Sequence, residues 1–192
     1  MFINIENIEV PFFNVREDAE TWLKNFRGIR LWHATRVLDI NEIYTKGLKI
    51  PVKRELDDRL LDFLKLKPWY TSKVDEIVYA HSVSSGEQPA IYTIIDKCDL
   101  HLKYFDHYLL YGSEYWQFIM EVLAGKGYGV GRAELLNYGH AYILGLDLFW
   151  EDLDPCERDY VVNAVYEHDF HNCSIALFQA VSAASVSSIE IN

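Results

Sequence analysis

The chain of 192 residues has little cysteine, few basic residues and no long apolar run. Its three cysteines, Cys98, Cys156 and Cys173, are widely spaced and odd in number. This pattern argues against a disulfide framework or a zinc knuckle and favours a reducing cytoplasm. No apolar run approaches the roughly 20 residues that span a bilayer, and the first residues lack the basic flank of a signal peptide. We therefore expect a cytoplasmic protein that does not enter a membrane.

Basic residues are scarce relative to acidic ones. There are 18 Lys and Arg against 29 Asp and Glu, giving a formal net charge of −11. A broad nucleic-acid surface is therefore not expected, because phosphate binding is driven by clustered Lys and Arg. Half of the residues are hydrophobic and 15% are aromatic, which is enough for a buried core. We expect a single domain over residues 1–192.

The hydrophobic pattern predicts strands and helices without regular alternation. Residues 2–13 suggest an edge strand or extended arm, and a capping box of Asn14 and Glu17 predicts a helix over 15–26. Further helices are expected from Asp39 to Gly47, over 52–66 and 104–124, and after Asp154, Pro155 and Glu157. Strands are expected at 29–35, 76–81, 90–96, 141–149, 173–180 and 186–191. This order predicts the α+β class.

The most informative segment is 30–50. It is expected to form a short apolar strand ending on His33 and Thr35, followed by a capped helix that stops at Gly47. Such a layout brings one imidazole and one hydroxyl to the end of a buried strand. The alternative is that His33 is a core histidine with its hydrogen bonds satisfied.

The residues Leu-Trp-His33-Ala34-Thr35-Arg36 resemble the first NAD-binding motif of ADP-ribosyltransferases of the poly(ADP-ribose) polymerase type. That motif has the form Leu-Trp-His-Gly-Ser/Thr-Arg and is followed by a helix and Gly-Leu. Ala34 replaces the usual glycine but keeps the backbone amide and carbonyl that grip the nicotinamide amide in that family. The resemblance implies that His33 binds a ribose hydroxyl, that Thr35 is the small hydroxyl residue and that Arg36 reaches a phosphate.

Tyr79 lies in Glu-Ile-Val-Tyr-Ala-His-Ser, which resembles the second motif of the same family. The resemblance implies that Tyr79 ends a strand and stacks on nicotinamide, with Ser82, Ser84 and Ser85 in a turn that faces the ligand. A core or edge tyrosine is an equally good interpretation.

Glu114 follows Ser113 in Tyr-Gly-Ser-Glu-Tyr-Trp, which resembles the third motif. The resemblance implies that Ser113 contacts NAD and that Glu114 bonds the ribose and activates the acceptor. Cleavage of the nicotinamide–ribose bond passes through an oxocarbenium-like state, which a nearby carboxylate stabilises. Ordinary capping at a helix start is the alternative for Glu114, and Glu134 is the reserve candidate for the acid.

Two other patterns give weaker evidence for a functional site. Residues 167–171, Glu-His-Asp-Phe-His, contain metal-ligand types, but no third or fourth ligand with suitable spacing is apparent, so exposed polar residues are expected there. The glycine-rich residues 125–131 lack the Lys-Ser/Thr ending of a phosphate loop and suggest a turn. No metal site is predicted.

Taken together, the resemblance implies a split β-sheet core with flanking helices and NAD as substrate. It implies transfer of a single ADP-ribose to a macromolecule, with a protein acceptor favoured and a nucleic-acid acceptor left open. A transferase domain of this size is typical of a toxin, effector or defence factor. Two alternatives remain. One is an NAD glycohydrolase with the same residues, and the other is a non-catalytic module whose aromatic side chains bind a partner: Trp69, Tyr70, Tyr104, Phe105, Tyr108 and Tyr111.

Overall fold

The computed structural model describes residues 1–50, 52–82, 90–101, 106–171 and 173–191. Its sheet contains β1 (Phe2–Ile3), β2 (Gly28–Val37), β3 (Ile91–Ile94), β4 (His140–Phe149), β5 (Ser174–Leu177) and β6 (Val186–Ile191). The strand order is β5-β3-β2-β4-β6, and β1 pairs with β2 in parallel. The other pairings are antiparallel. An antiparallel sheet with separate helices agrees with the predicted α+β class.

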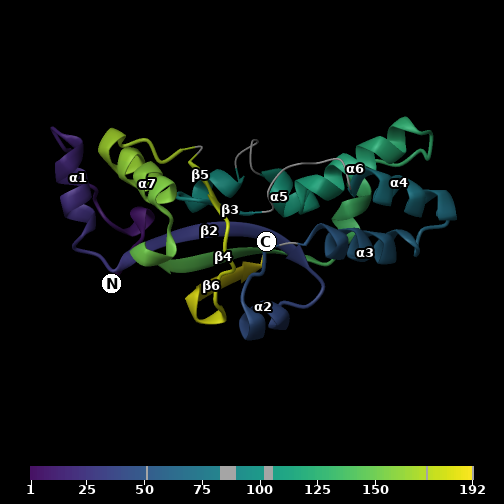
Figure 1. The fold of residues 1–192 in the computed structure, drawn as a ribbon, viewed down its shortest axis with the longest axis horizontal. Helices are drawn as coiled ribbons and strands as arrows, with labels where there is room; N and C mark the ends of the chain where they lie inside the picture. The colour runs from purple at the N-terminus through teal and green to yellow at the C-terminus, as the bar shows by residue number, and fades with distance from the viewer. Residues whose placement is uncertain (51, 83–89, 102–105, 172, 192) are drawn as a thin grey trace.

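Most of the helices lie at the two ends of the molecule, with α2 and α5 nearer its middle (Figure 1). The helices are α1 (Arg16–Leu23), α2 (Asn41–Lys46), α3 (Lys53–Leu64), α4 (Ser72–Ser82), α5 (Asp106–Tyr111), α6 (Glu114–Gly125) and α7 (Pro155–Glu167). Short 3-10 turns are η1 (Ile5–Asn7), η2 (Lys97–His101), η3 (Arg132–Asn137), η4 (Trp150–Asp152) and η5 (Ala183–Ser185). Helices α1 and α7 lie at one end, whereas α3, α4 and α6 lie together at the other. In the described part of the chain, no helix is both long and apolar enough to cross a membrane.

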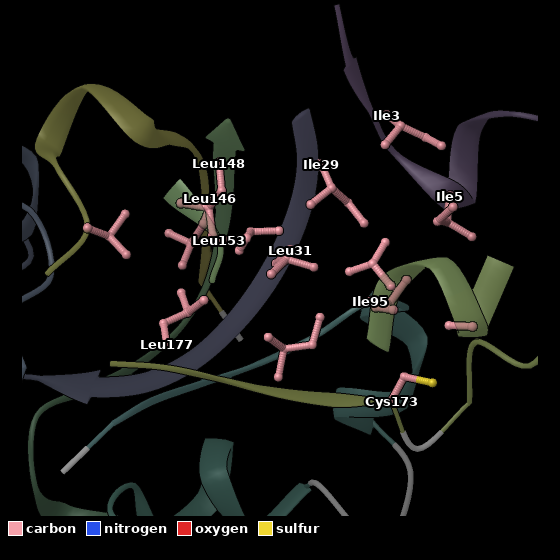
Figure 2. Packing of buried hydrophobic residues seen from close by; sticks show 14 of the residues in the cluster. Ile3, Ile5, Ile29, Leu31, Ile95, Leu146, Leu148, Leu153, Cys173 and Leu177 are labelled. Atoms are coloured by element: carbon pink, nitrogen blue, oxygen red, sulfur yellow. The ribbon is translucent and has the colours of Figure 1, made fainter. Parts of the chain in front are cut away.

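Strands β2 and β4 are the centre of the sheet and pair along their whole length, from Gly28 opposite Phe149 to Val37 opposite His140. Because side chains alternate between the faces of a strand, the two faces of this pair carry different clusters. Ile29 and Leu31 belong to the larger cluster, here called the sheet core, together with Leu146, Leu148 and Leu153 (Figure 2). Trp32 and Ala34 belong to a small cluster on the opposite face, here called the α5-side cluster, with Ile94, Leu100, Leu109 and Ile143.

A third set of buried residues joins α3, α4, α6 and η3 at the far end of the molecule. This helical cluster consists of Leu60, Leu61, Leu64, Val74, Val78, Trp116, Ile119, Met120, Leu123, Leu135 and Tyr138. Its members recur at helical spacing on each helix, as an amphipathic face requires.

Several local predictions are confirmed. Helix α7 begins with a capping box in which the Asp154 side chain accepts from the Glu157 N–H (2.8 Å) and Glu157 accepts from the Asp154 N–H (2.7 Å). Helix α2 ends at Gly47, whose φ of +74° suits glycine. Helix α3 and strands β4, β5 and β6 lie within or close to their predicted ranges. Strand β2 does not end on His33 and Thr35 as expected, because it continues to Val37 and pairs with β4 along its whole length.

The predicted strand at 76–81 is wrong, because these residues belong to helix α4. Val74 and Val78 are both completely buried in the helical cluster, and their spacing of four residues is that of a helix face. The short apolar run Ile-Val-Tyr-Ala is compatible with a strand or a helix, and Val74, which reveals the helical spacing, lies outside the predicted strand. Ser84 and Ser85 of the expected turn lie outside the described residues.

Three other predicted boundaries differ from the structure. The helix expected over 104–124 is two helices, because Gly112 (φ +74°) interrupts it between α5 and α6; residues 104 and 105 lie outside the described residues. At the N-terminus, the cap of α1 is Val15 rather than Asn14, without a side-chain capping bond. The expected arm forms only the short strand β1 and the turn η1.

Candidate functional site

His33 lies half-buried on β2, and its Nδ1 is 2.8 Å from the carbonyl oxygen of Tyr92 on β3. Because a carbonyl oxygen only accepts, this contact places the imidazole proton on Nδ1 and leaves Nε2 as an acceptor. Burial lowers the pKa of His33, and the bond to Tyr92 partly offsets that effect. The ring is therefore neutral near pH 7, with its tautomer fixed by the backbone.

The sheet opens beside this histidine. In the described residues, β2 pairs with β3 at one position, Trp32 opposite Ile94, although it pairs with β4 throughout. At the next residue, the His33 side chain binds the Tyr92 carbonyl, a group that strand pairing would otherwise use. The Tyr92 side chain is 45% exposed. An aromatic ring and an imidazole thus lie at the point where β2 and β3 separate.

Glu114 is the first residue of α6, and its side chain is 60% exposed. Its Oε1 accepts a hydrogen bond from the Tyr108 hydroxyl (2.8 Å) and lies 3.3 Å from Nε2 of His107. Burial and the bond to Glu114 both raise the pKa of Tyr108, so its hydroxyl remains a donor. Ser113 precedes Glu114 as the helix cap and makes no side-chain capping bond. Ser113 therefore does not cap α6 through its side chain, and helix capping accounts for this Ser-Glu pair only in part.

His33 and Glu114 approach the opening from different faces of the sheet. Alternation along β2 places His33 on the face of the sheet core, whereas Tyr108 packs against the α5-side cluster. Tyr92 connects the two groups, because its carbonyl binds His33 and its phenol lies close enough to Tyr108 to contribute to the raised pKa. Thr35 shares the face of His33, and Ala34 is buried on the other face.

Tyr79 lies away from this opening, in the helical part of the molecule. Its hydroxyl donates to Oδ1 of Asp58 on α3 (2.9 Å), and the Arg54 guanidinium lies 4.1 Å from the centre of its ring. The side chain packs against the helical cluster. The structure therefore does not bring Tyr79 together with His33 and Glu114, and the expected convergence of these three residues is not found.

Arg36 is engaged by backbone carbonyls. Its Nε donates to Tyr138 O (2.9 Å), Nη1 to Leu109 O (3.0 Å), and Nη2 to Leu136 O (2.9 Å) and Gly139 O (3.0 Å). These carbonyls belong to α5, to η3 and to the two residues that follow η3. The guanidinium thus ties β2 to two neighbouring elements instead of facing a phosphate.

The reserve acid lies away from His33, and the described aromatic residues of the predicted partner surface do not form a single cluster. Glu134, the reserve acid, forms an ion pair with Lys67 (2.8 Å) at the helical end. The aromatic residues of the predicted partner surface divide between two clusters: Trp69, Tyr70 and Tyr111 pack against the helical cluster and Tyr108 against the α5-side cluster. Tyr104 and Phe105 lie outside the described residues. A depression of about 390 Å³ between α4 and the end of α6 contains none of the predicted site residues.

Sequence reasoning missed three residues of the opening, namely Tyr92, His107 and Tyr108. His107 and Tyr108 carried no signal, because on the continuous helix that was predicted they would lie about 10 Å from Glu114, and they reach it only because Gly112 separates α5 from α6. Tyr92 carried no signal of its own, since its role depends on the separation of β2 from β3. In comparisons with known proteins, the chain matches no family model, no curated protein and no solved structure.

Proposed function

We propose that this chain binds NAD at the opening between β2 and β3, cleaves its nicotinamide–ribose bond and transfers one ADP-ribose to a macromolecule. The observation that carries the proposal is the neutral imidazole of His33, held by the Tyr92 carbonyl within the motif Leu-Trp-His-Ala-Thr-Arg. Its Nε2 is an acceptor, as a bond from a ribose hydroxyl requires.

The roles of the other residues follow from their chemistry. Glu114 places negative charge where the ribose carbon becomes positive, and Tyr108 orients the carboxylate through its hydroxyl. Tyr92 takes the stacking role in place of Tyr79, because its ring is 45% exposed and its carbonyl holds His33. NAD is the substrate in this scheme.

The charge of the molecule bears on the acceptor. A net charge of −11 favours association with a basic protein surface over a nucleic acid. A protein acceptor is therefore proposed. Because Glu114 is largely exposed, water also reaches the carboxylate, and hydrolysis of NAD is the outcome that competes with transfer.

The decisive experiment is incubation of the chain with adenylate-labelled NAD and a whole-cell lysate, followed by protease or nuclease treatment. Protease-sensitive label supports the proposal, and nuclease-sensitive label moves the acceptor to nucleic acid. Free ADP-ribose without labelled macromolecule indicates a glycohydrolase. Absence of both NAD consumption and any thermal shift with NAD rejects the enzyme and leaves the non-catalytic module.

Three variants test the assignment of residues. Glu114→Gln is expected to lower turnover by about 100-fold or more while NAD affinity stays within a few-fold, because the carboxylate acts mainly on the transition state. His33→Ala is expected to weaken NAD binding in calorimetry. Tyr79→Phe is the matched control and should leave both quantities unchanged, since Tyr79 bonds Asp58 instead. Wild-type turnover in Glu114→Gln would remove Glu114 from the mechanism.

A further inference from the structure

A second group of side chains meets where β3 ends and β5 begins. These two strands pair, with Ile94 opposite Ser174. Asp96 follows β3 by two residues and Asp99 lies in η2, whereas His171 precedes β5 by three residues. One ligand atom from each of Asp96, Asp99 and His171 lies within 4.8 Å of the other two. The strand pairing thus gathers two carboxylates and an imidazole that are far apart in sequence.

The distances suit one small cation between the three groups. Nδ1 of His171 is 3.0 Å from Oδ1 of Asp99 and 3.8 Å from Oδ2 of Asp96. A tetrahedral zinc ion with bonds of about 2.0–2.1 Å separates its ligand atoms by about 3.3–3.4 Å. The two observed separations lie on either side of that value, so small side-chain movements allow a shared ion.

The two carboxylates of this group are largely removed from water. The Asp99 side chain is completely buried and that of Asp96 is 19% exposed. Asp99 accepts a hydrogen bond from Nδ1 of His171 (3.0 Å), which offsets part of the cost of burying its charge, and a divalent ion bound by the three groups would take the place of that bond. The Cys98 N–H binds Oδ1 of Asp96 (2.9 Å) and so fixes that carboxylate. The His171 side chain, at 68% exposed, keeps the group open to solvent.

We propose that Asp96, Asp99 and His171 bind one divalent transition-metal ion, with zinc as the best fit. The imidazole argues against magnesium and calcium, which prefer oxygen ligands alone. Three protein ligands leave a fourth position for water, on the solvent side where His171 is exposed. The ion would join η2 to the loop between α7 and β5. None of the residues of the proposed NAD site takes part, so this inference is independent of that proposal.

The test is calorimetric titration of the chelator-treated full chain with Zn²⁺. One equivalent is expected to bind. His171→Ala and Asp96→Asn should each raise the Kd about tenfold or more, as loss of a ligand does. The exposed residues His140 and Asp62 provide matched controls, and His140→Ala and Asp62→Asn should leave the Kd unchanged. His171 is mostly exposed but is the hydrogen-bond partner of the buried Asp99, so the folded state of each variant is checked by circular dichroism before titration. Absence of binding, or an unchanged Kd in His171→Ala, overturns the proposal.

Cys98 needs its own control, because it is exposed and lies between the two aspartates in sequence. Cys98→Ser is expected to keep the wild-type Kd for Zn²⁺, and the Co²⁺ complex should lack a thiolate charge-transfer band. Loss of binding in Cys98→Ser, or the presence of that band, would assign the ion to a cysteine site and overturn the proposed ligand set. Mg²⁺ and Ca²⁺ should produce no heat at the concentrations that saturate with Zn²⁺.

Discussion

Arg36 illustrates, at the scale of one residue, how a single side chain can fix several elements. Its four hydrogen bonds to carbonyls use the forked geometry of a guanidinium, which lysine cannot reproduce. Arg36→Lys is therefore expected to lower the free energy of unfolding by about 2 kcal/mol, since several carbonyls lose their donors. Urea denaturation measures this change.

The control for that prediction is Arg132→Lys. Arg132 is exposed and pairs with Glu121 at the surface, so its replacement should cost less than about 1 kcal/mol. The two roles considered for Arg36 also separate here. If Arg36 binds a phosphate, Arg36→Lys should weaken NAD binding with little change in the free energy of unfolding. If Arg36 instead serves to bond the four carbonyls, the main effect should be a lower free energy of unfolding.

His33 gives the molecule a defined response to acid. Burial lowers its folded-state pKa below the ordinary value of 6.5, so between these two values the unfolded chain binds more protons. Stability from this group is complete above the ordinary value and is lost as the pH falls from that value through the lower folded-state pKa. His33→Asn, whose amide can still donate to the Tyr92 carbonyl, should lose less stability between about pH 7.5 and about pH 5. Urea titrations of both proteins at several pH values test this, and equal losses would contradict it.

At the scale of elements, Gly112 decides where one helix ends and the next begins. Its φ of +74° separates α5 from α6 and so sets Tyr108 and Glu114 within hydrogen-bonding distance. A Cβ at this position meets only ordinary contacts with Arg36, so the expected cost of Gly112→Ala is conformational, about 1–2 kcal/mol. Thermal or urea unfolding measures it. Gly125→Ala is the control, because Gly125 has an ordinary φ and open space around it, and its replacement should be neutral or stabilising.

How much of each element could be predicted depended on where its determining interactions lie. The start of α7 was predicted correctly because Asp154, Pro155 and Glu157 act on their own backbone. Helix α4 was not, because its identity depends on burial of Val74 and Val78 against helices that are distant in sequence. The same limit applied to the candidate site. The position of His33 on a strand followed from the local pattern, but the partners of Arg36 lie about 70–100 residues away and carry no local signal.

At the scale of the whole molecule, two large clusters are buried separately. The sheet core and the helical cluster share no residue, and Arg36 and the α5-side cluster lie between them. Separate cores favour partly independent opening, because the contacts of the helical cluster can be lost without exposing the sheet core. The proposed NAD site lies near the junction, since Tyr108 and Glu114 belong to helices that connect the two parts. Opening of the helical part would therefore displace the carboxylate while leaving His33 in the sheet.

Two leucine variants test this independence with identical chemistry. Leu60 in the helical cluster and Leu31 in the sheet core are both completely buried, so Leu60→Ala and Leu31→Ala should each cost about 2–5 kcal/mol. Native-state hydrogen exchange should distinguish them. Leu60→Ala is expected to lower protection mainly in α3, α4 and α6, whereas Leu31→Ala should lower it throughout, because β2 pairs with β4 along its whole length and α5 packs against it. If Leu60→Ala lowers protection equally in β2 and β4, the two clusters unfold as one unit, and Arg36 couples them more tightly than their separate burial indicates.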